Sequence, residues 1–313
     1  MAQNVTTFVP DLLYLGSDDY DTFGENGGPT WIQRWVELER TGVQDPLAPP
    51  GSPPLGVVLL IDNDGATRRA LSGLSSASST YPSEYSDATM AQIRDMSLLL
   101  PITRTAAAMK AAEPRAGASD GVRAAHARSD DARGVRGGNQ LRAPFTKQPP
   151  CTLHLRMRSM GKWGTCFAQY LQASGGSLDA WIAHLTQCCA IRCRVVIIDS
   201  SGYVKMKTQG PQLRAMRDAG IKVCTQCDHH RFLPANAQET GAADAIKDNY
   251  SDLLWLLDAL GETDLAQSRL DTESYPMVSL RYVVVFGILY GNKAITPSLR
   301  TVPDHVPFFR KVR

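Results

Sequence analysis

Hydrophobic and polar residues follow distinct patterns along the chain, and these patterns predict helices in some segments and buried strands in others. In TWIQRWVELERTG, residues 30–42, apolar side chains recur at near-helical spacing, which predicts a helix. The short apolar runs GVVLLID, residues 56–62, and VVIID, residues 195–199, are typical of strands buried on both faces. RYVVVFGILYG, residues 281–291, is interpreted as a further strand, because its two glycines disfavour a helix.

The second half of the chain alternates helical and strand patterns. SLDAWIAHLTQCC, residues 177–189, is an amphipathic helix with Ser177 as its expected cap, and IKVCTQCDHH, residues 221–230, is interpreted as a strand that runs into a polar loop. YSDLLWLLDALG, residues 250–261, predicts a helix that stops at its final glycine, whereas residues 297–313 look irregular because prolines interrupt them. Strands that alternate with helices imply right-handed crossovers, so we expect a three-layer α/β/α fold with a mainly parallel sheet.

The composition changes sharply in residues 103–150, which are rich in Ala, Arg, Gly and Asp and have almost no large apolar side chain. Such a segment cannot bury enough surface to offset its ordering entropy, so it is predicted to be a long disordered insertion. From Arg104 to Lys147 it carries nine basic and four acidic residues, an excess of five positive charges. A solvated linker is the first interpretation, and contact with polyanions or protein partners is the alternative.

These patterns divide the chain into five segments. They are an N-terminal helical extension (1–54), the first part of an α/β domain (55–102), the basic insertion (103–150), the second part of the domain (151–265) and a C-terminal extension (266–313).

The overall composition indicates a soluble globular protein. Of its 313 residues, 43% are hydrophobic and 20% are charged, which is sufficient to bury a core. The net charge of +2 creates no overall field for nucleic acid, so any attraction for phosphate must come from local patches. The N-terminal residues do not resemble a secretory signal, and no apolar run is long enough to span a membrane. Together with seven cysteines, this predicts a cytoplasmic protein with reduced thiols.

Four short stretches bring acidic residues and histidines to the expected ends of strands or helices. They are DNDGATRRAL at 62–71, VVIIDSSG at 195–202, CDHH at 227–230 and LDALGETDL at 257–265. In a parallel sheet the ligand site lies beyond the carboxyl ends of the strands, so we expect these distant segments to meet at one rim. Carboxylates combined with histidine suit two divalent metals.

Taken in order, these stretches resemble the motifs of the DHH phosphoesterase superfamily, and in particular its RecJ-like nuclease branch. IDNDGATRRAL fits the family's Asp-x-Asp-Gly strand end and following helix, and LLLPITR, residues 98–104, approximates its second signature, an apolar strand that ends in Pro-x-x-Arg or Pro-x-Arg. VVIIDSSG is similar to the Val-Asp-Asn-Gly strand end, and Asp228–His230 matches the name-giving Asp-His-His. LDALGETDL is similar to the Leu-Gly-x-x-x-Asp motif, so the resemblance covers roughly residues 55–265.

The resemblance implies a two-metal site that hydrolyses phosphodiester bonds in single-stranded nucleic acid or short oligonucleotides, with a smaller phosphoanhydride as another candidate substrate. The implied metal ligands are Asp62, Asp64, Asp199, Asp228, His229 and Asp264. His230 would contact the scissile phosphate or serve as a ligand, and Arg104 and Arg231 would hold substrate phosphates. This set of ligands favours Mn²⁺ or Mg²⁺, and two such ions about 3.5–4 Å apart would activate water and hold the phosphoryl oxygens.

Other interpretations stay open at this point. The main alternative is a catalytically inactive DHH-fold scaffold or nucleic-acid-binding protein. A haloacid-dehalogenase-like phosphatase would use Asp62 as nucleophile and Asp64 as acid/base, and a papain-like protease would use Cys166 at the opening of a helix with His229 or His230 as base. A structural zinc site is the remaining candidate, although packing is the simpler role for its cysteines, Cys188, Cys189, Cys193, Cys224 and Cys227.

Overall fold

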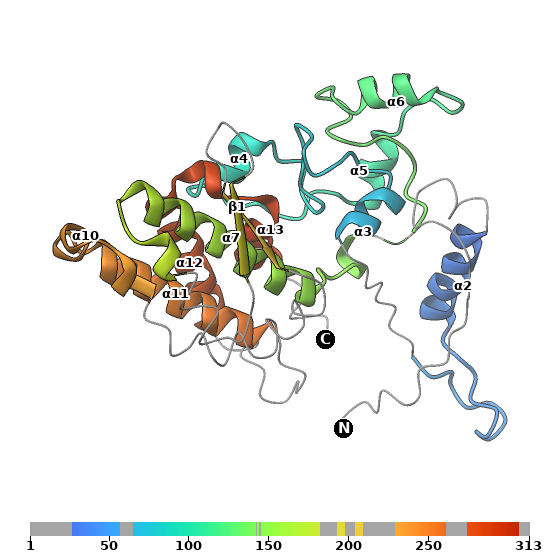
Figure 1. Cartoon of the computed structure of the whole chain (residues 1–313). Helices are drawn as coiled ribbons and strands as arrows, with labels where there is room; N and C mark the ends of the chain where they lie inside the picture. Colours follow the sequence, from blue (N-terminus) through green and yellow to red (C-terminus); the bar gives the residue numbers. More distant parts are fainter. Residues whose placement is uncertain are drawn as a thin grey trace. The chain divides into compact units, whose positions relative to one another are not determined.

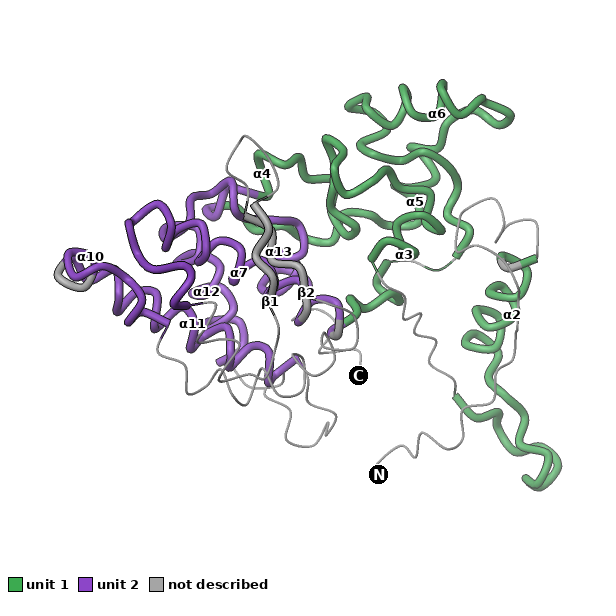
Figure 2. The backbone as a smooth tube through the Cα atoms, in the orientation of Figure 1, with its two compact units in different colours: residues 1–93, 98–151 green, residues 94–97, 152–313 purple. Residues whose placement is uncertain are grey.

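The computed structural model describes residues 27–56, 65–141, 143, 145–181, 193–197, 204–208, 229–260 and 274–306. The chain divides into two compact units, which Figure 2 draws in green and purple. Unit 1 comprises Met1–Ile93 and Leu98–Cys151, and unit 2 comprises Arg94–Ser97 and Thr152–Arg313.

Unit 1 is built from short helices connected by long loops (Figure 1). Its helices are α2 (Gly28–Thr41), α3 (Gly65–Leu71), α4 (Met90–Arg94, whose last residue belongs to unit 2), α5 (Ala106–Ala111), α6 (Asp120–His126) and η2 (Phe145–Lys147). The helix predicted at residues 30–42 is confirmed by α2. Its Ile32 packs with Leu71 of α3 and with Leu141 in a small apolar core, and Trp31 packs against this cluster.

The interpretation of residues 103–150 as a disordered insertion is wrong for the described part of this segment. Thr105 caps α5 by accepting a hydrogen bond from the backbone N–H of Ala108 at 3.1 Å. Met109, Val135 and Leu141 are buried, each no more than 3% exposed. The composition suggested disorder because the segment has few apolar side chains. Few are needed here, since hydrogen bonds between polar groups connect the loops.

Unit 2 is a helical bundle around an aromatic core. Its helices are α7 (Thr152–Ala173), η3 (His229–Phe232), α10 (Ala235–Glu239), α11 (Ala242–Ala259), α12 (Ser274–Tyr290), η5 (Asn292–Ala294) and α13 (Pro297–Asp304). The helix predicted at 250–261 is confirmed by the second half of α11, and the cap by Ser177, whose hydroxyl accepts from the backbone N–H of Ala180 at 3.3 Å. Helices α11 and α12 pack together, and Asn249 donates from its side chain to the carbonyl of Tyr282 at 2.9 Å.

A buried arginine of α13 attaches a short stretch of the first half of the chain to unit 2. Arg300 donates to the carboxylate of Asp304 at 2.7 Å and to the backbone carbonyl of Asp95 at 3.2 Å. The side chains of Arg300 and Asp304 are only 2% and 4% exposed. Residues Arg94–Ser97 therefore belong to unit 2 although the residues on both sides of them belong to unit 1.

The expected three-layer α/β/α fold with a mainly parallel sheet is wrong. The described strands, β1 (Cys193–Ile197) and β2 (Val204–Thr208), pair antiparallel with each other, and all other regular structure in the described ranges is helical apart from isolated bridges. The apolar run at 195–199 does contain a strand. Its partner is the next segment of the chain, which an apolar run alone does not specify.

Three local predictions also fail. The supposed strand at residues 281–291 is the C-terminal half of α12, and the closing segment expected to be irregular contains α13. Residues 98–104, interpreted as a strand end, have no regular structure. The glycine does not interrupt α12, and it allows a close contact: a Cβ on Gly287 would lie 3.1 Å from the side-chain oxygen of Asn292 in η5.

Candidate functional site

The structure places few of the predicted metal ligands. The five carboxylates of the expected two-metal site lie outside the described residues: Asp62, Asp64, Asp199, Asp228 and Asp264. Within the ranges that the structure describes, no three His, Cys, Asp or Glu side chains come together in a way that could hold a metal ion. The two-metal site therefore stays a prediction.

His229, the one predicted ligand that is described, lies in the aromatic core of unit 2. Its side chain is buried at the start of η3, with 4% of the residue exposed. Its Nδ1 accepts a hydrogen bond from the indole N–H of Trp181 at 3.0 Å. The rings of Tyr250, Trp163 and Phe167 surround it, at centroid distances of 4.3, 5.1 and 5.9 Å.

This hydrogen bond fixes the chemistry of the His229 ring. An indole N–H can only donate, so Nδ1 carries no proton and a neutral ring carries its proton on Nε2. A histidine that binds a metal through Nε2 normally donates from Nδ1, which is the opposite arrangement. Within the described part of the chain, Nε2 is buried and makes no hydrogen bond. In this geometry His229 is a core residue that bonds Trp181.

The neighbours of His229 in η3 face more solvent. His230 is half-buried, and its backbone carbonyl accepts from Leu233 at 3.0 Å. Arg231 is exposed, and its guanidinium lies 5.0 Å from the centre of the Phe232 ring. Neither contact identifies a substrate, so their proposed roles stay predictions.

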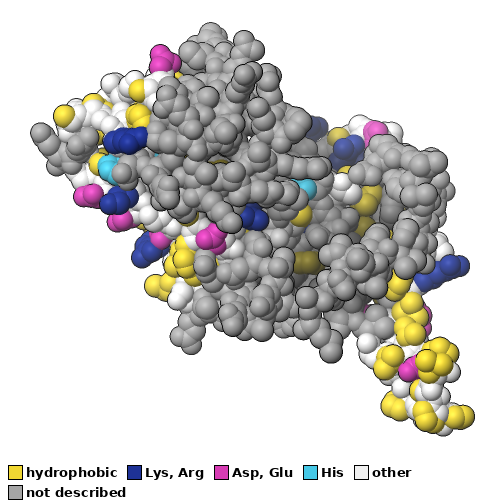
Figure 3. Space-filling model, turned by 60° about the horizontal axis from the view of Figure 1, so that its bottom comes forward, with side chains coloured by type: hydrophobic (Ala, Val, Ile, Leu, Met, Phe, Trp, Pro, Cys, Tyr) yellow, Lys and Arg dark blue, Asp and Glu magenta, His cyan; other side chains and the backbone are white. Residues whose placement is uncertain are grey.

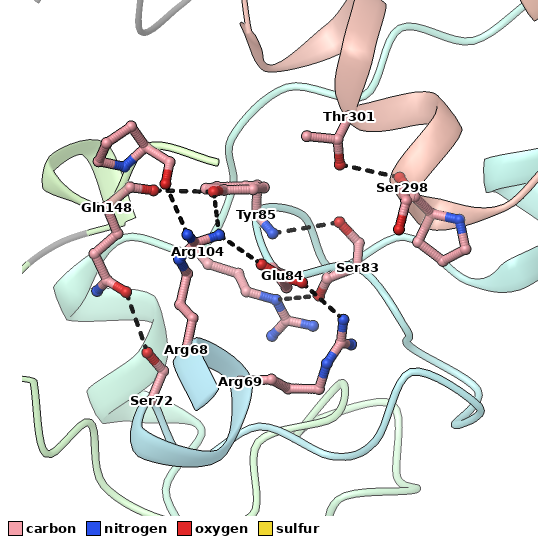
Figure 4. A network of polar contacts seen from close by, with 12 residues as sticks. Arg68, Arg69, Ser72, Ser83, Glu84, Tyr85, Arg104, Gln148, Ser298 and Thr301 are labelled. Carbon is pink, nitrogen blue, oxygen red and sulfur yellow. Dashed lines mark hydrogen bonds and ion pairs between the residues drawn. The ribbon is translucent and has the colours of Figure 1, made fainter. Parts of the chain in front are cut away.

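Arg104, expected to hold a substrate phosphate, donates hydrogen bonds to backbone carbonyls of unit 1, and Figure 4 shows the one to Ser83. It donates to the carbonyls of Ser83 at 3.2 Å, Ser86 at 3.1 Å and Arg133 at 3.0 Å. The residue is only 3% exposed, and burial lowers the pKa of its guanidinium to about 10. This arrangement connects two loops and supports a structural role.

Two further buried arginines share a single carboxylate beside Arg104. Arg68 and Arg69 of α3 pair with Glu84 at 2.8 and 3.1 Å (Figure 4). Arg68 also donates to the hydroxyl of Tyr85 at 2.7 Å and to the carbonyl of Pro149 at 2.7 Å. In the sequence this helix was interpreted as part of a metal motif, and the role of its two arginines was not predicted. Two adjacent arginines do not by themselves indicate burial.

Cys166, the nucleophile of the alternative protease interpretation, lies well inside α7 and not at the opening of a helix. That local expectation is wrong, so the dipole of a helix N-terminus is not available to this thiol. Burial raises the pKa of Cys166, and nearby Lys162 offsets only part of this effect. A raised thiol pKa is the reverse of what a cysteine nucleophile needs.

Figure 3 shows the basic side chains of one face dispersed among other types, with no single large basic patch on the described part of that face. A more localised candidate is a hollow of about 510 Å³ in unit 1, between the end of α5 and the 137–138 turn. We call it the basic hollow. Its lining residues are Lys110, Glu113, Pro114, Arg115, Ala116, Gly117, Ala118, Arg123, Gly137 and Gly138.

The charges at the basic hollow are unevenly compensated. Lys110 pairs with Glu113 at 2.7 Å, and Arg123 pairs with Asp120 at 2.7 Å. The same Asp120 carboxylate lies 3.4 Å from Arg136. Arg115 is exposed and forms no ion pair with any described residue.

Gly137 and Gly138 form one wall of the hollow, which we call the glycine wall, and a close backbone contact holds it in place. The carbonyl of Gly73, just after α3, accepts from the N–H groups of Arg136 at 2.7 Å and Gly137 at 3.2 Å. Gly73 has a φ of 69°, and a Cβ there would lie 2.3 Å from the carbonyl oxygen of Gly137. A side chain at position 73 would therefore displace this wall.

No protein-family model matches the chain, and no curated protein sequence matches it at a significant level. No helix in the described ranges is both long and apolar enough to cross a membrane.

Proposed function

We propose that this protein binds single-stranded nucleic acid through the basic hollow of unit 1. The observation that carries the proposal is the concentration of Lys110, Arg115 and Arg123 around one hollow, in whose described lining Glu113 is the single acidic residue. Three of the nine basic residues between Arg104 and Lys147 thus line one hollow of a folded surface. A volume of about 510 Å³ lies within the roughly 300–1,000 Å³ range of small-ligand sites.

The lining chemistry favours phosphate contacts over base contacts. Among the described residues, the lining contains no aromatic ring on which a base could stack. Lysine and arginine attract phosphates without regard to base identity, so the binding is sequence-independent and weakens with salt. A flexible single strand can bend a phosphate into a hollow, whereas a duplex is stiff over about 150 base pairs. These considerations support a single strand as the ligand.

Hydrolysis of the bound strand is a separate prediction, which depends on carboxylates outside the described residues. The buried position of His229 gives it no support, and the proposal here is limited to binding. The same binding assay tests hydrolysis when Mn²⁺ is added and the oligonucleotide is examined for shortened products.

The test is fluorescence anisotropy with a labelled single-stranded oligothymidylate at several salt concentrations. We expect binding that weakens as salt increases and that is reduced in Arg115→Ala. A positive charge about 4 Å from a phosphate contributes about 1 kcal/mol in water, so the expected loss is roughly five-fold. Arg128→Ala is the matched control, because Arg128 is exposed in the same segment and does not line the hollow. Absence of binding at low salt, or equal losses in both variants, would refute the proposal.

A further inference from the structure

We propose that the acidic residues Glu113 and Asp120 restrain the basic hollow, leaving Arg115 as its main phosphate-binding cation. This inference rests on the proposed function and adds a mechanism for its strength. Two of the three basic residues that line the hollow are already paired with carboxylates of the same chain. A phosphate that enters meets one uncompensated positive charge and competes for the others.

Arg115 is placed to act alone. It lies in the turn between α5 and α6, where its carbonyl accepts from the backbone N–H of Ala118 at 3.2 Å. Its side chain is exposed, and Gly117 in the same turn has no side chain to obstruct the approach of a phosphate. A planar guanidinium can donate two parallel hydrogen bonds to one phosphate, which suits recognition of a single group.

Glu113 opposes binding in two ways. Its carboxylate lies 2.7 Å from the ammonium group of Lys110 and cancels that charge. It also lines the hollow, so an entering phosphate meets a like charge. The Glu113 side chain is 23% exposed while that of Lys110 is 79% exposed, so the lysine is the more mobile partner. Removing the Glu113 charge therefore releases Lys110 toward the ligand.

Asp120 restrains two arginines at once. It pairs with Arg123, which lines the hollow, and lies within 3.4 Å of Arg136, which precedes the glycine wall. Because one carboxylate compensates two guanidinium groups, its removal changes the local charge balance for both. Asp120→Asn is therefore expected to strengthen binding at least as much as Glu113→Gln.

The experiment measures the affinity for oligothymidylate, and its salt dependence, in the wild type, Glu113→Gln and Asp120→Asn. We expect each variant to bind roughly two- to five-fold more tightly at low salt, with a smaller gain at high salt. Each further phosphate contact should steepen the logarithmic salt slope by about 0.7. Asp131→Asn makes the same charge change at an exposed carboxylate that does not line the hollow, and it is expected to have a smaller effect.

The outcomes separate the two proposals. If the wild type binds and loses affinity in Arg115→Ala, but Glu113→Gln and Asp120→Asn bind no better than Asp131→Asn, the restraint by acidic residues is refuted and the proposed function stands. If neither the wild type nor these variants bind at low salt, the proposed function fails and this inference fails with it. Binding by the two acidic-site variants without binding by the wild type would also refute the proposed function, and this inference with it, because the protein itself would then not bind the strand.

Discussion

Replacing Arg104 by methionine is expected to destabilise unit 1 without a direct effect on phosphate binding. Methionine keeps much of the apolar stem of the side chain but removes all three hydrogen bonds to the carbonyls of Ser83, Ser86 and Arg133. Hydrogen bonds from a charged donor contribute about 1.5–3 kcal/mol each, or roughly 5–9 kcal/mol for three. Burial lowers the pKa of Arg104 to about 10, which corresponds to about 3 kcal/mol against the charged form. The difference between these two contributions predicts that Arg104→Met lowers the free energy of unfolding by about 2–6 kcal/mol.

The assay is urea unfolding of the whole chain, followed by circular dichroism and by tryptophan fluorescence, to which Trp31 and Trp35 contribute from unit 1 and Trp163 and Trp181 from unit 2. Arg115→Met is the matched control, because it removes the same group from an exposed position and is expected to change the unfolding midpoint little. The reasoning would be refuted if Arg104→Met unfolds at the same urea concentration as the wild type. If that variant were equally stable and also lost oligonucleotide binding, Arg104 would be a phosphate contact, as the sequence first suggested.

Three further predictions concern packing, pH and thiol reactivity. Gly287→Val should cost about 1–3 kcal/mol in urea unfolding, because its branched side chain must enter the contact with Asn292, while Gly287→Ala should be nearly neutral; equal midpoints for both would contradict this packing. Burial tends to raise the pKa of Asp87, but hydrogen bonds from Arg133 and Thr103 outweigh burial and lower the pKa below its ordinary value. The stabilisation of the fold by ionised Asp87 is therefore present above about pH 4 and is lost as the pH falls through the pKa of Asp87 in the folded protein. Asp87→Asn should therefore be less stable than the wild type at pH 6, by under about 1 kcal/mol, and the gap should close by pH 2; a gap independent of pH would be inconsistent with this. Cys166, buried with a raised pKa, should be alkylated more slowly than half-buried Cys151 in the native protein when both are mapped by mass spectrometry, and equal rates would exclude the burial described.

The helices with one apolar face could be predicted from the sequence. In residues 30–42 the spacing of apolar side chains matches α2, because only one face of that helix meets the core of unit 1. The cap at Ser177 was also predictable, since a serine hydroxyl satisfies a free N–H group at a helix start. These features depend on residues that are close together in the sequence.

Helix α12 was not predictable by the same reasoning. Its run of valine, phenylalanine and leucine is apolar on most faces, and such a run does not distinguish a buried helix from a buried strand. The weight given to Gly287 as a helix breaker was misplaced, because its contact with η5 depends on residues that come after the helix.

The candidate site was predictable only in part. The excess of basic residues in 103–150 is visible in the composition, but its division into buried and exposed groups is not. Arg104 is buried because carbonyls from residues 83, 86 and 133 surround it, whereas Arg115 lies in an exposed turn. Both are arginines in polar surroundings, and only the fold determines which is accessible to a ligand.

Because Arg94–Ser97 belong to unit 2 but lie within the sequence of unit 1, the chain cannot be cut once into two complete units. A single break at the 151/152 boundary would produce a C-terminal fragment without the backbone carbonyl of Asp95, which Arg300 contacts. The guanidinium of Arg300 would remain beside Asp304 but would lack that acceptor. In the N-terminal fragment, Arg94–Ser97 would be separated from the unit 2 residues with which they pack. Separate halves of this protein should therefore be less stable than the intact chain, and mixing them should restore part of the loss.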